Sequence, residues 1–125
     1  MGGMTAFHYM TQDNLPYDVW FHCAKEIDPV FDNPPAVIEW VKLDDCELTP
    51  ELLELAVNAA AKVIALLEND KSVLISCIEG RNRSALVVAL ALLQMGYKNP
   101  ISILRFKRHA AVLSNQSFCA AIRKA

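Results

Sequence analysis

Three short apolar runs along the chain have the composition of β-strands. Residues 18–23 (DVWFHC) and 37–43 (VIEWVKL) are rich in valine and aromatic side chains, and residues 73–75 (VLI) are continuously apolar. Such runs are typical of buried strands. Because the second run is mostly apolar, we expect it to be an internal strand of the sheet. Residues 28–35 contain three prolines, so no helix is expected to cross them.

Apolar residues recur at helical spacing between the second and third runs. The repeating positions are Leu52, Ala56, Ala59, Val63 and Leu66. This spacing predicts an amphipathic helix that ends at about Glu68. Thr49 and Pro50 are typical of an N-cap and a first helical position, so the helix is expected to begin there.

The C-terminal third of the chain predicts three more helices. Residues 85–95 are apolar on nearly every face, and Gly96 follows as a helix stop. Asn99 before Pro100 repeats the cap-and-proline pattern and predicts a helix through about Arg108. A last short helix is expected after a cap at Ser114 or Asn115.

Strands that alternate with helices indicate an α/β fold with a central, mostly parallel sheet flanked by helices. The 125 residues suffice for one core, so we expect a single domain over residues 1–125. A net charge of −2 favours neither a nucleic-acid partner nor a membrane surface. The four cysteines lack zinc-site spacing and fit a reducing compartment. We therefore expect a cytoplasmic protein without a metal or another cofactor.

Residues 77–84 (CIEGRNRS), which we call the signature loop, lie between the third apolar run and the buried helix. A loop between a strand and a helix N-terminus points backbone N–H groups inward and binds anions. A thiol in that field is expected to ionise more readily than a free cysteine. Arg83 adds a planar, two-pronged donor that matches a phosphate. The residues alone therefore predict a phosphate-binding loop that contains a nucleophile, Cys77.

The signature loop resembles the C-x5-R-[ST] motif of the protein tyrosine phosphatase superfamily, especially its small dual-specificity branch. The resemblance continues through the apolar helix, Gly96, Asn115 and Phe118, and covers about two thirds of the chain from Val37 onward. It implies a dual-specificity phosphatase-like domain that forms a phosphocysteine intermediate. The implied catalytic residues are Cys77 as nucleophile, Arg83, and Ser84, which assists departure of the thiolate. The implied phosphate-binding residues are Ile78, Glu79, Gly80, Arg81, Asn82 and Arg83.

A general acid must come from outside the signature loop, and residues 44–47 (DDCE) carry three carboxylates. The separation between Asp45 and Cys77 is similar to that between acid and nucleophile in small dual-specificity members. Asp44 is the alternative, although its side chain points elsewhere if the backbone is extended there. We expect Asp45 to be the acid.

Ser76 departs from the family pattern, which usually has histidine immediately before the nucleophile. A serine carries no charge, so Cys77 is expected to be less fully ionised than in family members with histidine. This departure motivates an alternative function, a catalytically weak pseudophosphatase that binds phosphate. Gly80-Arg81-Asn82-Arg83 also resembles the loop of RNA 5′-triphosphatases, although those continue with Thr-Gly, and this second alternative stays open.

The expected substrate is phosphotyrosine in a protein or peptide, with phosphoserine and phosphothreonine as further substrates. Relatives that hydrolyse phosphoinositides tend to carry extra lysines in the loop, and Glu79 argues against that class. The acidic net charge of the chain does not favour an RNA surface.

Overall fold

The computed structural model describes residues 17–26, 28, 37–77, 82–108 and 111–125. Three parallel strands form a sheet in the order β2-β1-β3, namely β1 (Val19–His22), β2 (Val37–Trp40) and β3 (Val73–Ser76). The central strand β1 is fully buried, as its run of valine and aromatic residues predicts. The α/β class and the parallel sheet are confirmed.

The prediction that the second apolar run is internal was wrong, because β2 lies at one edge of the described sheet. Val37 is 65% exposed, and the rest of β2 is half-buried. The strand is also shorter than expected and ends at Trp40. Val41 and Leu43 are buried beyond its end, so their apolar character reflects core packing of the following segment rather than strand pairing.

The long helix α2 (Pro50–Glu68) has the bounds that the periodic pattern predicts. The Thr49 side chain accepts a hydrogen bond from the Leu52 N–H, so Thr49 is the N-cap. The buried positions of α2 are Ala56, Ala59, Ala60 and Val63, which pack into the core beside Ile75 and Leu86. These small residues allow α2 to approach α3 closely, and the two helices pack against each other.

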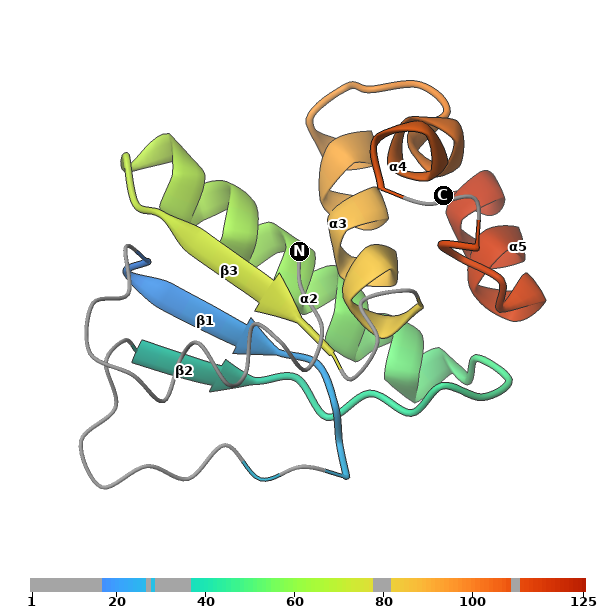
Figure 1. Cartoon of the computed structure of the whole chain (residues 1–125), viewed down its shortest axis with the longest axis horizontal. Helices are drawn as coiled ribbons and strands as arrows, with labels where there is room; N and C mark the ends of the chain where they lie inside the picture. Colours follow the sequence, from blue (N-terminus) through green and yellow to red (C-terminus); the bar gives the residue numbers. More distant parts are fainter. Residues whose placement is uncertain (1–16, 27, 29–36, 78–81, 109–110) are drawn as a thin grey trace.

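Three further helices follow β3, namely α3 (Arg83–Gln94), α4 (Pro100–Lys107) and α5 (Gln116–Lys124). Figure 1 shows α2 along one face of the sheet, α3 starting beyond the carboxyl end of β3, and α4 and α5 beyond α3. Gly96 has φ +96° and follows α3 as the predicted stop. No helix among the described residues is long and apolar enough to cross a membrane.

The two asparagines expected to cap the last helices behave differently. Asn115 caps α5, because its side-chain oxygen accepts hydrogen bonds from the Ser117 and Phe118 N–H groups. Asn99 precedes α4 in the left-handed region, with φ 56°, and forms no side-chain cap. Asn99 therefore occupies the N-cap position and α4 begins at Pro100, as predicted, but the side chain of Asn99 adds no capping hydrogen bond. Its left-handed backbone forms the turn before the helix, for which asparagine is well suited.

Candidate active site

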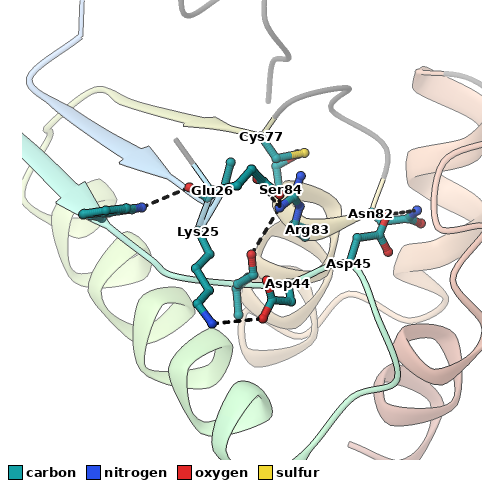
Figure 2. Close-up of polar contacts among 11 residues, drawn as sticks. Lys25, Glu26, Asp44, Asp45, Cys77, Asn82, Arg83 and Ser84 are labelled. Carbon is teal, nitrogen blue, oxygen red and sulfur yellow. Dashed lines mark hydrogen bonds and ion pairs between the residues drawn. The ribbon is translucent and has the colours of Figure 1, made fainter. Parts of the chain in front are cut away.

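Cys77 follows the last residue of β3, where the strand meets the start of α3. Cys77 is buried, with 5% of the residue surface exposed. The Cys77 Sγ atom lies 3.2 Å from the Ser84 Oγ atom, and Ser84 is itself fully buried in the first turn of α3. Parallel α/β sheets bind ligands at this carboxyl edge. The structure thus brings the predicted nucleophile and the predicted hydroxyl into direct contact (Figure 2).

Four of the expected phosphate-binding residues, Ile78, Glu79, Gly80 and Arg81, lie outside the described residues. Asn82 is described and immediately precedes α3, and its carbonyl accepts a hydrogen bond from the Leu86 N–H. Its side chain turns toward Asp45, to which its Nδ2 atom donates at 2.9 Å. Asn82 therefore links the signature loop to the candidate acid.

Arg83 begins α3, and its side chain is only 7% exposed. Its Nη1 atom lies 2.5 Å and 2.8 Å from the two carboxylate oxygens of Glu26 and 3.2 Å from the carbonyl oxygen of Leu43. These contacts use Nη1, so a two-pronged contact with a phosphate can use Nε and Nη2. Glu26 was not among the predicted site residues, because an acidic residue in the turn after β1 matches no motif.

The two neighbouring aspartates point in different directions (Figure 2). Asp44 faces Lys25, whose Nζ atom lies 3.4 Å from Asp44 Oδ2. Asp45 accepts one hydrogen bond on each carboxylate oxygen, from Asn82 Nδ2 and from Asn115 Nδ2, both at 2.9 Å. Asp45 therefore lies against the residue that precedes Arg83, whereas Asp44 is directed toward Lys25.

Ser76 is buried beneath the site and forms a specific contact with the neighbouring strand. The indole N–H of Trp20 donates to Ser76 Oγ at 2.6 Å, and both side chains are inaccessible to solvent. The Trp20 ring also packs edge-on against the His22 ring, with centroids 5.0 Å apart. A serine at this position is therefore the hydrogen-bond acceptor of a large buried indole, a role that the sequence alone did not indicate.

Cys23 lies beside Cys77, one position beyond the paired residues His22 and Ser76 of β1 and β3. Burial, with a smaller contribution from the neighbouring Cys77, raises the pKa of the Cys23 thiol well above its ordinary value. Cys23 thus stays protonated at neutral pH and is a packing residue. All four cysteines are free, and no cluster of metal-ligating side chains occurs among the described residues.

The fold is that of the protein tyrosine and dual-specificity phosphatases. Human DUSP28 superimposes with a TM-score of 0.80 at 18% identity, covering 99% of this chain and 84% of DUSP28. OH1 from the Orf virus, a tyrosine phosphatase with triple substrate specificity, gives a TM-score of 0.77 at 16% identity, covering 99% of this chain and 79% of OH1.

A mouse protein described as a dual-specificity phosphatase, solved with zinc tungstate, gives a TM-score of 0.75 at 20% identity. The match covers 95% of this chain and 74% of the mouse chain. No family sequence model matches the chain, and no curated protein does. The resemblance inferred from the signature loop is thus confirmed at the level of the fold.

Proposed function

We propose that this protein is a cysteine-dependent phosphatase that hydrolyses phosphate monoesters through a phosphocysteine intermediate. The observation that carries this proposal is the contact between Cys77 Sγ and Ser84 Oγ at the N-terminus of α3, with the buried Arg83 guanidinium in the same turn. A buried thiol in an apolar core has no need of an adjacent arginine. A thiolate that attacks phosphorus needs this cation and the positive end of the helix.

In the first step, the Cys77 thiolate attacks phosphorus in line with the ester oxygen. The sulfur–phosphorus bond forms as the phosphorus–oxygen bond breaks, and Asp45 donates its proton to the departing oxygen. The Nε and Nη2 atoms of Arg83 and the amides of the signature loop hold the equatorial oxygens. Glu26 and the Leu43 carbonyl keep the Arg83 side chain in position through Nη1.

In the second step, water attacks the phosphocysteine and releases inorganic phosphate. The Asp45 carboxylate takes the proton from water as the sulfur–phosphorus bond breaks. The Ser84 hydroxyl, 3.2 Å from the sulfur, donates a hydrogen bond to the departing thiolate. Every step is completed by residues of this chain, and we infer that turnover needs no metal.

The proposed substrates are phosphotyrosine and, as further substrates, phosphoserine and phosphothreonine in proteins or peptides. The solved proteins with this fold include OH1, a tyrosine phosphatase with triple substrate specificity. The presence of four free cysteines supports a reducing compartment, and we propose a cytoplasmic location. The alternatives are a pseudophosphatase that binds phosphate without turnover and an RNA 5′-triphosphatase-like enzyme.

Hydrolysis of p-nitrophenyl phosphate in EDTA tests the proposal. We expect turnover by the parent protein and none by Cys77→Ser, in which the weaker hydroxyl nucleophile replaces the thiolate. Tungstate, the tetrahedral oxyanion in the mouse neighbour, should inhibit the parent and still bind Cys77→Ser. Tungstate binding without turnover by the parent would support the pseudophosphatase, and equal turnover by both proteins would refute the covalent mechanism.

A further inference from the structure

The loop that carries Asp45, which we call the acid loop (residues 41–49), contacts the start of α5 through several side chains. We propose that Asn115 is a positioning residue that holds the Asp45 carboxyl group beside the signature loop, together with Asn82. This inference rests on the proposed function, in which Asp45 is the proton donor. It adds a residue from the far end of the chain to the mechanism.

Asn115, Asn82 and Asp45 form a closed ring of hydrogen bonds. Asn115 Nδ2 donates to Asp45 Oδ1, and Asn82 Nδ2 donates to Asp45 Oδ2, each at 2.9 Å. The ring closes because the Asn115 backbone N–H donates to Asn82 Oδ1 at 3.0 Å. Each carboxylate oxygen therefore has an amide donor, and both rotation and translation of the Asp45 side chain are restricted.

The backbone determines which way both asparagine amides face. The oxygen of Asn115 accepts from the N–H groups of Ser117 and Phe118, so its NH2 group must face Asp45. The oxygen of Asn82 accepts from the Asn115 N–H, which likewise turns its NH2 group toward Asp45. A backbone N–H is always a donor, so the opposite orientation of either amide would place two donors together.

The start of α5 also holds the backbone of the acid loop. Asn115 Nδ2 donates to the Cys46 carbonyl at 2.9 Å, and the Leu48 N–H donates to Ser117 Oγ at 3.0 Å. The segment just before Asn115 is held by α4, because Arg105 donates to the carbonyls of Val112 and Leu113, both at 3.0 Å. The positioning of Asp45 thus depends on packed helices rather than on the exposed loop alone.

The two amide contacts leave room for the proton that an acid must carry. The two oxygens of a carboxyl group offer about four lone-pair sites, so an oxygen that accepts an amide N–H can also hold a proton. Proton transfer to a leaving group is effective only when the donor is held within hydrogen-bond reach of it. Release of the Asn115 contact should therefore impair proton donation without altering the nucleophile.

Leaving-group dependence provides the test. Nitrophenolate leaves readily without a proton, whereas phenolate depends on the acid. We expect Asn115→Ser to lower kcat/KM by about 10- to 100-fold for phenyl phosphate, and by less than about threefold for p-nitrophenyl phosphate. The serine hydroxyl can still cap α5, so the fold is preserved, but it provides no amide donor to Asp45. Gln116→Ala, which removes an exposed amide from the same helix start, should leave both rates unchanged.

A second variant and a double-mutant cycle complete the experiment. Asn115→Asp also retains a cap, yet sets a carboxylate against Asp45, and should impair phenyl phosphate hydrolysis at least as strongly. In an Asp45→Asn background, Asn115→Ser should have no further effect. The positioning role of Asn115 would be overturned by equal losses of kcat/KM for both substrates, by additive losses in the cycle, or by no loss. None of these results would by itself refute the proposed phosphatase activity. A parent protein without Cys77-dependent turnover of either substrate would overturn the proposed function as well.

Discussion

Arg83 and Glu26 form an ion pair between the first turn of α3 and the turn after β1, in which Arg83 Nη1 contacts both carboxylate oxygens of Glu26. The arginine side chain is 7% exposed and the glutamate side chain 51% exposed, so the pair lies at the boundary of the core. Such a pair restricts the guanidinium to one position in the folded protein, ready for the phosphate contact proposed for Arg83. The conformational entropy of this long side chain is therefore lost when the protein folds rather than when a ligand binds.

The first prediction concerns this pair. Glu26→Gln keeps a hydrogen-bond acceptor of the same shape but removes the charge, so we expect kcat/KM to fall by about 3- to 10-fold. Arg83→Lys should cost about 100-fold or more, because an ammonium group cannot form the two-pronged contact. Steady-state kinetics with p-nitrophenyl phosphate measures both effects. Glu47→Gln, at an exposed carboxylate of the acid loop, is the control; a loss there as large as for Glu26→Gln would refute the specific role of Glu26.

The second prediction separates the two aspartates. Asp45→Asn should lower kcat for phenyl phosphate by about 10²- to 10⁴-fold, the usual contribution of general acid catalysis. It should also flatten the basic limb of the pH–rate profile. Asp44→Asn should change kcat by less than about threefold, because it removes only an exposed ion pair with Lys25. The opposite ranking would assign the acid to Asp44, and two mild effects would favour the pseudophosphatase.

The signature loop was recognisable from the sequence because its parts are local. Cys77, Arg83 and Ser84 occur within eight consecutive positions, between an apolar run and an apolar helix. Their proximity follows from chain connectivity, so a spacing rule suffices to predict it. The strand and helix types were predicted for the same reason, since periodicity is a local property.

Contacts between distant segments could not be predicted in this way. Glu26 meets Arg83 only because β1 lies beside β3 in the sheet, and the order of strands is not encoded in any one of them. The edge position of β2 was missed for the same reason. Asn115 was expected to cap a helix, and it does, but its second contact with Asp45 requires the packing of α5 against α3.

The third prediction uses the raised pKa of Cys23. The folded protein keeps this buried thiol protonated, whereas the unfolded chain loses the proton above about pH 8.5. The unfolded state then binds fewer protons than the folded state, so the free energy of unfolding must fall as pH rises through this range. By pH 10 the loss should reach about 2 kcal/mol, and below about pH 8 it should vanish. Urea unfolding of the parent and Cys23→Ala, compared at pH 7.5 and 10, isolates this contribution. Parallel pH dependence in the two proteins would contradict it.

The fourth prediction concerns Ser76, where the chain departs from the family pattern. The Trp20 indole donates to the Ser76 hydroxyl and occupies the space beside it, and neither side chain reaches solvent. An imidazole at position 76 would therefore overpack the core and displace this hydrogen bond. We expect Ser76→His to cost about 1–3 kcal/mol of unfolding free energy and to lower Tm by about 5–10 °C.

If the Trp20 indole prevents a histidine from fitting at position 76, replacement of Trp20 by a smaller residue should allow it to fit. Trp20→Leu destabilises the protein by itself because it leaves a cavity, but the double variant with Ser76→His should be more stable than the sum of the two single losses predicts.

The same double variant tests what the histidine contributes to the thiol. The rate of Cys77 alkylation by iodoacetamide, followed against pH and corrected with Cys77→Ser, should rise at lower pH when the imidazole is present. A Ser76→His protein as stable as the parent would show that Trp20 does not restrict the position. Additive losses would show that the two residues are independent and that the Trp20 indole is not what excludes histidine from position 76.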